Sequence, residues 1–249
     1  MLEKVSVITV VYNDVKNIEA TIQSVLKQDY ENIEYIIIDG NSTDGTTEIC
    51  NKYKNKVSIL LSEPDTGIYN AMNKALAIAS GEWIFFLNSG DIFFNGFVIS
   101  EMLLSEKSAD IIYGKAITKD NTVCFFPKKI TISMFMFERM VCHQCIFARR
   151  ETFFNNKFDE RYKIIADRIW LYNCFLNKRV TTRKDLIVAV YDTTGVSSNI
   201  KEFDVESLHY LKKCSFFYYL IARCKRTLRF CYNCVKKIGL RIKRGKDEK

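Results

Sequence analysis

Apolar runs and helical stripes alternate along the first third of the chain. The runs are continuous and rich in β-branched side chains, which is typical of strands buried on both faces. They cover Val5–Tyr12, Ile33–Ile38, Val57–Leu61 and Trp83–Leu87. Between them, apolar side chains recur at helical spacing in the segments 18–26, 43–53 and 67–80. This alternation predicts an α/β fold with a doubly wound, mostly parallel central sheet flanked by helices.

The pattern loosens from Asp110 onward but still predicts regular elements. These are a hairpin (Ile111–Ile117 with Thr122–Phe126), a strand (Cys145–Arg149), a helix (Ala166–Asn177) and a last strand (Val180–Tyr191). No internal repeat or low-complexity linker interrupts this region. We therefore expect one domain over residues 1–200 and a separate tail over residues 201–249.

The tail carries an apolar stripe of its own. Its members recur at alternating steps of four and three, the spacing of one helix face. They are Phe217, Ile221, Cys224, Leu228, Cys231, Val235, Ile238 and Ile242, with lysines and arginines between them. A basic amphipathic helix of this kind suits the surface of an anionic membrane. The alternative is that the stripe packs on the preceding domain or on a second copy of the chain.

The positive charge of the chain is concentrated in this tail. The whole chain holds 37 Lys and Arg against 29 Asp and Glu, a net charge of +8. Residues 200–249 contain 14 basic and 5 acidic side chains, so the rest of the chain is close to neutral. This asymmetry favours contact with an anionic surface through one end and disfavours nucleic acid as a partner of the whole protein.

Cysteine usage and apolar run length indicate where the protein acts. Nine cysteines are scattered through a chain too long to need disulfide staples, which indicates reduced thiols in the cytoplasm. No apolar run approaches the roughly 18 to 20 residues of a membrane span. Together with the basic tail, this predicts a cytoplasmic protein that is peripheral on the inner face of the cell membrane.

Polar side chains follow each of the first four apolar runs, where the predicted strands end. They are Tyr12, Asn13 and Asp14, then Asp39, Ser42 and Asp44, then Glu63 and Asp65, and finally Asn88 and Asp91. Ligands bind at this edge in open α/β sheets. Each aspartate alone could be a helix cap or a turn residue, but carboxylates gathered at one edge suit a divalent cation and a hydroxyl-rich ligand. The glycine-rich fingerprints of dinucleotide and P-loop sites are missing from the sequence.

Four runs of the sequence resemble the family 2 glycosyltransferases, which have the GT-A fold. The runs are VSVITVVYND, IEYIIIDGNSTDGT, SEPDTGIYNAMNKALAIASGEWIFFLNSGD and VCHQCIFARRE, and the resemblance covers about residues 4–198. The sequence looks most like bacterial enzymes of cell-surface polysaccharide synthesis. The resemblance implies an inverting hexosyl- or N-acetylhexosaminyltransferase that uses a nucleotide-diphosphate sugar, commonly a UDP-sugar, with Mg²⁺ or Mn²⁺. It also implies an acceptor hydroxyl on a glycan, which would be free or linked to polyprenyl diphosphate.

The same resemblance assigns roles to residues at the strand ends. Tyr12 and Asn13 would border the nucleotide base. Asp39 would accept hydrogen bonds from the base or the ribose, and Asp65 lies in a segment that contacts the nucleotide. Asp91 would bind the metal that bridges the diphosphate.

Two residues of the second half receive roles in the same way. The resemblance implies that Asp167 is the catalytic base, which takes the proton of the acceptor hydroxyl. A positioned carboxylate typically accelerates such a step about 10²–10⁴-fold. His143 would contact the diphosphate or the acceptor, and a structural histidine is the alternative.

The sequence departs from the family pattern at the end of the fourth strand. The usual Asp-x-Asp-Asp reads Asn88-Ser89-Gly90-Asp91 here, so one carboxylate remains for the metal. Asn88 can still bond the ribose through its amide. The alternative function is therefore a non-catalytic sugar-nucleotide-binding or scaffold protein that has kept the fold.

Overall fold

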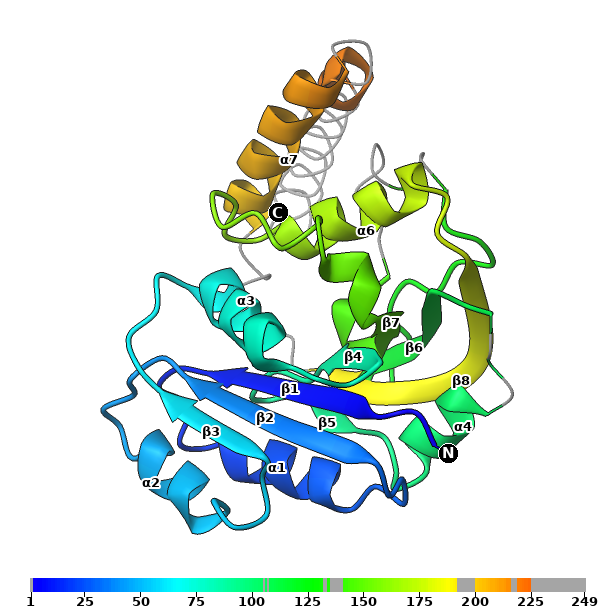
Figure 1. The fold of residues 1–249 in the computed structure, drawn as a ribbon. Coiled ribbons are helices and arrows are strands. Elements are labelled where there is room, and N and C mark those ends of the chain that lie inside the picture. The colour runs from blue at the N-terminus through cyan, green and yellow to red at the C-terminus, as the bar shows by residue number, and fades with distance from the viewer. Residues whose placement is uncertain are drawn as a thin grey trace, which may run out of the picture.

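An eight-stranded sheet forms the centre of the part of the chain that the computed structural model describes, residues 2–104, 106, 108–131, 134, 141–191, 200–215 and 219–224 (Figure 1). The strand order is β3-β2-β1-β4-β7-β6-β8-β5. The strands are β1 (Val5–Val11), β2 (Ile33–Asp39), β3 (Ile59–Ser62), β4 (Trp83–Phe86), β5 (Ile92–Phe93), β6 (Ile111–Thr118), β7 (Ile146–Arg149) and β8 (Thr181–Tyr191). The helices are α1 (Ile18–Leu26), α2 (Thr46–Lys52), α3 (Ile68–Ile78), α4 (Val98–Leu103), α6 (Ala166–Leu176) and α7 (Ile200–Cys214), with the short 3₁₀ helices η1 (His143–Cys145) and η2 (Arg150–Phe153).

The strands β3, β2, β1 and β4 form the parallel part of the sheet. β1 pairs with β2 and with β4, and β2 pairs with β3. Every residue of β1 is buried, which explains its continuous apolar sequence. The register aligns Val11 with Asp39 and Asp39 with Ser62, so these strands end together at one edge. The predicted α/β sheet is confirmed.

The other half of the sheet is mixed in direction. β7 is antiparallel to both β4 and β6, and β8 is parallel to β6. The predicted hairpin is confirmed only at its turn, where Val123 forms an antiparallel bridge with Ile117, and residues 124–126 do not continue it as a strand. β7 and β8 pair with the two sides of β6 only at Ile111–Tyr113. Two backbone hydrogen bonds hold the returning segment on β6, from the Thr118 amide to the Thr122 carbonyl at 2.9 Å and from the Cys124 amide to the Ala116 carbonyl at 2.8 Å.

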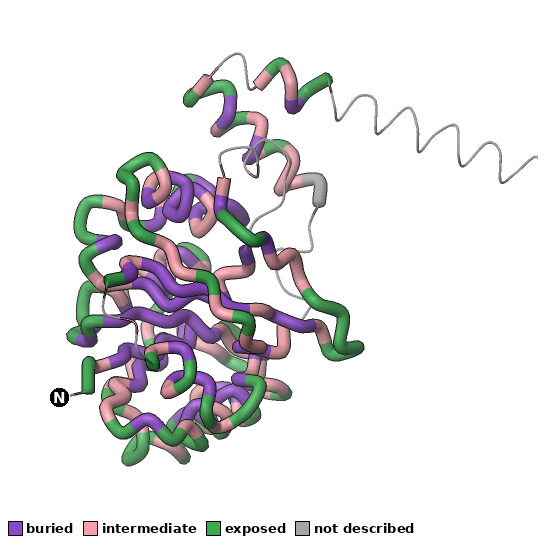
Figure 2. Tube along the Cα trace, turned by 90° about the vertical axis from the view of Figure 1, so that its right-hand side faces the viewer, coloured by how far each residue is buried: buried purple, intermediate pink, exposed green. Residues whose placement is uncertain are grey.

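Helices cover both faces of the parallel strands. α1 and α2 lie on one face, whereas α3 and α6 lie on the other (Figure 1). The buried positions accordingly concentrate in the strands (Figure 2). In the middle of the sheet, Phe85 stacks between Phe93 and Phe147, with ring centroids 4.9 and 4.3 Å away. This packed layer fixes the strand ends that carry the polar side chains.

The first helix of the predicted tail, α7, packs on α6 (Figure 1). The Arg168 guanidinium lies 4.4 Å from the centre of the Phe203 ring, and the rings of Tyr162 and Tyr210 meet edge to face at 5.9 Å. Leu211 is buried in the same contact. Phe217 and the stripe from Leu228 onward lie outside the described residues. Within the described residues, we find no helix of the length and apolar character that a membrane crossing requires.

Candidate functional site

The Asp39 carboxylate organises the loop that follows β2. It is fully buried and accepts hydrogen bonds from the amide and hydroxyl of Ser42, from the Thr47 hydroxyl at 2.8 Å and from the Ser62 hydroxyl at 2.6 Å. Buried carboxylates need such donors, and both oxygens are occupied by them. Contact of Asp39 with a base or ribose stays a prediction, and the observed role of this side chain is to shape the loop.

Asn13 and Asp44 tie the loop after β1 to the loop after β2. The Asn13 amide donates to the Ser42 hydroxyl at 2.8 Å, and its side-chain oxygen accepts from the Thr43 amide at 2.9 Å. Asp44 accepts from the Val15 amide at 3.0 Å. Asn13 adopts a left-handed conformation, with φ of 49°, which asparagine tolerates better than most residues. The two loops therefore form one ledge beside the strand ends.

Tyr12, Gly40 and Asp65 meet on this ledge. The Tyr12 ring is 65% exposed. A Cβ atom on Gly40 would lie 2.6 Å from Oδ2 of Asp65 and 3.2 Å from the Tyr12 ring, so the missing side chain makes room for the carboxylate beside the ring. Oδ1 of Asp65 accepts from the Gly67 amide at 2.8 Å. An exposed ring next to a carboxylate oxygen suits a planar base that stacks and donates an N–H.

Asn88 and Asp91 follow β4 at the same edge of the sheet. Ser89, between them, donates from its hydroxyl to Asp14 at 2.6 Å, which joins this loop to the ledge. Asp91 is 3% exposed, and its carbonyl accepts from the Thr21 hydroxyl at 2.8 Å. Oδ1 of Asn88 is buried without a hydrogen-bond partner. An unsatisfied buried acceptor costs about 1–3 kcal/mol, so this oxygen is a candidate contact for a ligand hydroxyl.

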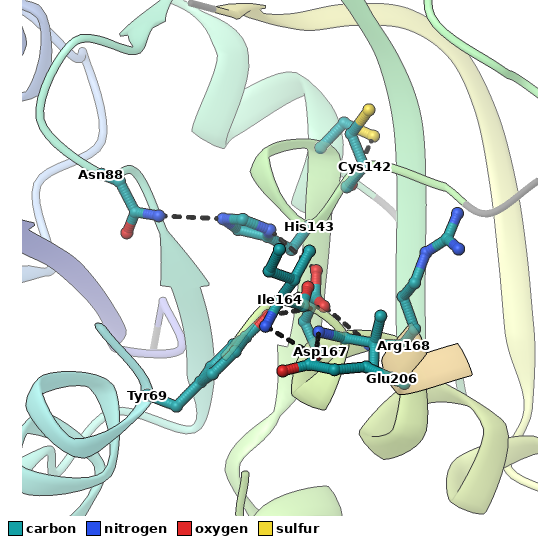
Figure 3. A network of polar contacts seen from close by, with 10 residues as sticks. Tyr69, Asn88, Cys142, His143, Ile164, Asp167, Arg168 and Glu206 are labelled. Atoms are coloured by element: carbon teal, nitrogen blue, oxygen red, sulfur yellow. Dashed lines mark hydrogen bonds and ion pairs between the residues drawn. The ribbon is translucent and has the colours of Figure 1, made fainter. Parts of the chain in front are cut away.

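A chain of hydrogen bonds connects Asn88 to Asp167 (Figure 3). Nδ2 of Asn88 lies 3.0 Å from Nε2 of His143, and Nδ1 of His143 lies 3.0 Å from Oδ2 of Asp167. The Tyr69 hydroxyl lies 2.9 Å from Oδ1 of Asp167 and 2.8 Å from the Ile164 carbonyl. The groups come from the end of β4 and from the starts of η1, α6 and α3. The fold thus brings the predicted base and His143 next to the predicted nucleotide residue Asn88.

The surroundings of Asp167 keep its carboxylate ionised. Burial raises the pKa of Asp167, but the hydrogen bond from His143, the charge of Arg168 and the hydrogen bond from Tyr69 are among the effects that outweigh burial, so the pKa lies below its ordinary 3.8. Burial and the Asp167 charge raise the pKa of Tyr69 well above 10.0, so its hydroxyl remains a donor. The Asp167 side chain is 17% exposed, which leaves it within reach of a ligand.

A carboxylate from α7 holds the backbone just before α6. Glu206 accepts from the amides of Lys163, Ile164 and Ile165 at 2.6, 2.9 and 3.2 Å. Amides at a helix start have no partner inside the helix and favour an anion. Glu206 therefore fixes the start of the helix that presents Asp167.

The sequence patterns do not mark four residues of this site: Tyr69, Glu206, Ser62 and Thr47. Tyr69 falls on the buried side of a predicted helix, and a buried tyrosine hydroxyl usually needs a partner, so this signal was present. Glu206 lies in the segment 201–249, which its basic residues marked as a tail, so this acidic side chain was not singled out. No local pattern marks Ser62 or Thr47 as donors to Asp39, because these bonds depend on the strand register.

Asp91 is the candidate ligand for a divalent cation. The ranges covered by the structure contain no cluster of three or more His, Cys, Asp or Glu side chains that could hold a metal. Mg²⁺ is usually bound by one or two carboxylates together with substrate phosphates. The residues present therefore fit a cation that binds together with a diphosphate, and Asp91 would hold it.

Comparison with known sequences gives a consistent result. The model of "Glycosyl transferase family 2" matches residues 6–186. The PGL/p-HBAD biosynthesis glycosyltransferase of Mycobacterium bovis (strain BCG / Pasteur 1173P2) is 29% identical over 209 residues, which cover 80% of this chain and 81% of that protein. Glycosyltransferase GlyG of Streptococcus pneumoniae serotype 4 is 33% identical over 126 residues, 49% of this chain and 42% of GlyG.

Comparison with solved structures shows the same kind of fold. S. aureus TarS 1–349 in complex with UDP-GlcNAc superimposes with a TM-score of 0.68 at 22% identity, over 84% of this chain and 65% of the TarS chain. Glucosyl-3-phosphoglycerate synthase of Mycobacterium tuberculosis, in complex with Mn²⁺, UDP and glucosyl-3-phosphoglycerate, gives a TM-score of 0.61 at 16% identity, over 85% of this chain and 80% of that one.

Proposed function

Since the chain belongs to glycosyl transferase family 2 and has the GT-A fold, we propose that it is an inverting glycosyltransferase of surface polysaccharide synthesis. It moves a hexosyl or N-acetylhexosaminyl group from a nucleotide-diphosphate sugar to a hydroxyl of a glycan or lipid-linked acceptor. The observation that carries this proposal is the hydrogen-bond chain from Asn88 through His143 to Asp167. It joins the candidate base to the donor edge, which we define as the ledge together with Asn88 and Asp91.

The donor nucleotide lies against the ledge in this proposal. Tyr12 stacks on the base, and Oδ2 of Asp65 accepts an N–H of the base. Oδ1 of Asn88, buried and unpaired, accepts a hydroxyl of the ribose or sugar. The UDP and UDP-GlcNAc complexes of TarS and the UDP complex of glucosyl-3-phosphoglycerate synthase support UDP as the nucleotide.

In this proposal, Asp91 would hold Mg²⁺ or Mn²⁺ together with the diphosphate. A bound cation supplies stabilisation of the negative charge that develops on the leaving diphosphate. Two similar structures support this cofactor: a Pyrobaculum calidifontis mannosyltransferase is in complex with GDP-Man and Mn²⁺, and the synthase above is in complex with UDP and Mn²⁺.

Asp167 takes the proton of the acceptor hydroxyl in the transfer step. Oδ1 already accepts from the Tyr69 hydroxyl and the Arg168 amide, whereas Oδ2 accepts from His143 and keeps a lone pair. As the acceptor oxygen bonds to the anomeric carbon, its proton passes to Oδ2. The bond from the anomeric carbon to the diphosphate oxygen breaks, and its electron pair leaves with the nucleoside diphosphate. Attack from the opposite face inverts the anomeric carbon.

The acceptor approaches from the side of α7. A hollow of about 260 Å³ there is lined by Arg161, Tyr162, His209 and Lys213. Basic side chains beside aromatic rings suit an anionic, glycan-bearing acceptor such as a polyprenyl-diphosphate-linked glycan. Together with the basic residues of the tail, this supports a protein that works peripherally at the cytoplasmic face of the membrane.

Calorimetric titration tests the donor part of the proposal. Wild type and Asp91→Asn are titrated with UDP, GDP and dTDP, each with and without Mn²⁺. We expect one nucleotide to bind wild type in a metal-dependent way, and we expect Asp91→Asn to lose the metal dependence. A folded sample that binds none of the three would favour the non-catalytic scaffold alternative.

Turnover of Asp167→Asn tests the assigned base. The variant keeps the size of the side chain but cannot take a proton, so transfer should fall about 10²–10⁴-fold while nucleotide affinity stays the same. Turnover equal to that of wild type would remove Asp167 from this role.

A further inference from the structure

The hydrogen bonds around His143 have a defined direction. The side-chain nitrogen of Asn88 can only donate, so the Nε2 atom that it faces at 3.0 Å must offer a lone pair. The ionised carboxylate of Asp167 can only accept, so the Nδ1 atom at 3.0 Å carries the hydrogen. The imidazole between them is therefore neutral, and the bonds run from Asn88 to His143 to Asp167 (Figure 3).

We propose that Asn88 is a positioning residue that keeps His143 neutral and thereby keeps Asp167 effective as a base. This inference rests on the proposed function, in which Asp167 takes the acceptor proton. It gives a reason for asparagine at a position where the family pattern has a carboxylate. The amide is retained for its N–H, which no carboxylate could supply.

A carboxylate at position 88 would reverse the bond to His143. It would accept a hydrogen from Nε2, so the ring would carry hydrogens on both nitrogens and a positive charge. An imidazolium 3.0 Å from Asp167 would stabilise the carboxylate more strongly than a neutral ring does. Because a more stabilised carboxylate is a weaker base, proton transfer from the acceptor would slow.

The other groups that face Asp167 leave this effect measurable. Ionisable neighbours of the Asp167 carboxylate besides His143 are Arg168, Tyr69 and Cys142. Burial and Asp167 itself hold Tyr69 in its neutral form, and the contact with Cys124, together with burial, raises the pKa of Cys142 well above its ordinary 9.0. Arg168 keeps its charge over the accessible pH range. His143 is therefore the neighbour whose charge residue 88 controls.

Nitrogen NMR of the histidine rings tests the inference without any turnover. The chain has two histidines, and a His209→Gln variant identifies the signals of His143. In metal-free wild type near pH 7, we expect one protonated and one unprotonated ring nitrogen, with the hydrogen on Nδ1. The charged fraction should rise in Asn88→Ala and rise further in Asn88→Asp. A hydrogen on Nε2 in wild type, or the same charged fraction in all three proteins, would overturn the inference.

Kinetics of the same variants separate a positioning role from a weakened metal site. We expect kcat of Asn88→Asp to fall about tenfold, because His143 becomes charged. If asparagine were only a lost metal ligand, Asn88→Asp would instead bind Mn²⁺ more tightly and turn over faster. Asn121→Asp, which adds the same charge in an exposed turn, is the matched control.

The two proposals fail in different ways. If wild type transfers no sugar from any nucleotide donor, the proposed function is wrong, and the ring measurement still decides the role of Asn88. Should Asn88→Asp not fold, as judged by circular dichroism, the charged fraction in Asn88→Ala decides it.

Discussion

Asp167 carries its charge in a largely enclosed position because hydrogen-bond donors point at both of its oxygens. The Tyr69 hydroxyl, the Arg168 amide and Nδ1 of His143 lie within 2.8 to 3.0 Å of the carboxylate. This arrangement ensures ionisation, but it also lowers basicity, since the same donors stabilise the anion. Rate enhancement by Asp167 therefore depends on its position beside Asn88 as well as on its proton affinity.

The lowered pKa of Asp167 predicts how stability depends on pH. Because the folded-state pKa lies below 3.8, the carboxylate stabilises the fold above that pH, and its contribution disappears as pH falls through the folded-state value. We expect Asp167→Asn to be less stable than wild type by about 1–2 kcal/mol at neutral pH. The difference should shrink below 3.8. Urea unfolding followed by circular dichroism at several pH values measures it, and a difference that grows toward acid would contradict the assignment.

At the scale of elements, the site depends on how α7 meets α6. Glu206 binds the amides of Lys163, Ile164 and Ile165, and the Ile164 carbonyl in turn shares the Tyr69 hydroxyl hydrogen with Asp167. One carboxylate thus fixes both the start of α6 and a partner of Tyr69. The helix that begins the predicted tail is part of the frame that holds Asp167.

Glu206→Gln tests this frame. The variant keeps the size of the side chain, but its amide nitrogen would face backbone donors, so one of the bonds becomes unfavourable. We expect a loss of about 1–3 kcal/mol in the free energy of unfolding. We also expect kcat to fall with an unchanged KM for the donor, because the hydrogen bonds of Glu206 found in the described part of the chain go to the backbone before α6. Glu31→Gln, at an exposed carboxylate, is the control; equal kcat values in both variants would argue against a role for Glu206 in positioning Asp167.

Elements and strand ends could be predicted from the sequence, whereas the bonds between them could not. Continuous apolar runs predict buried parallel strands, and ligands bind at the edge where such strands end. The sequence therefore predicted that Tyr12 and Asn88 lie at the same edge of the sheet. Contacts such as Ser62 with Asp39, 23 residues apart, or Asn88 with His143, 55 residues apart, require the register and packing of whole elements. The predicted hairpin forms only at its turn for the same reason, because the strand partners of β6 are β7 and β8, which come from distant segments.

At the scale of the whole molecule, the charge lies at one end of the chain. Residues 225–249 hold 10 Lys and Arg against 2 Asp and Glu, a surplus equal to the +8 of the whole chain. A chain that ends at Cys224 is therefore formally neutral and keeps α7 with Glu206. Deletion from residue 203 onward would instead remove Glu206 and disturb the start of α6, so it would confuse membrane binding with damage to the site.

Truncation after Cys224 is thus the sharper test of membrane contact through the tail. We expect full-length protein to bind vesicles that contain anionic lipid, and to release as salt increases, because basic side chains near such a surface contribute about 1 kcal/mol each. The truncated protein should bind anionic vesicles at least about tenfold more weakly than full-length protein does. On neutral vesicles, we expect the two proteins to bind alike. Turnover of the truncated protein on a water-soluble acceptor should be unchanged, since the hydrogen-bond partners of Asp167 and Glu206 described above all precede Cys224. Equal binding of both proteins to anionic vesicles would show that the tail is not the membrane contact, and would favour packing of the apolar stripe on the domain or on a second copy of the chain.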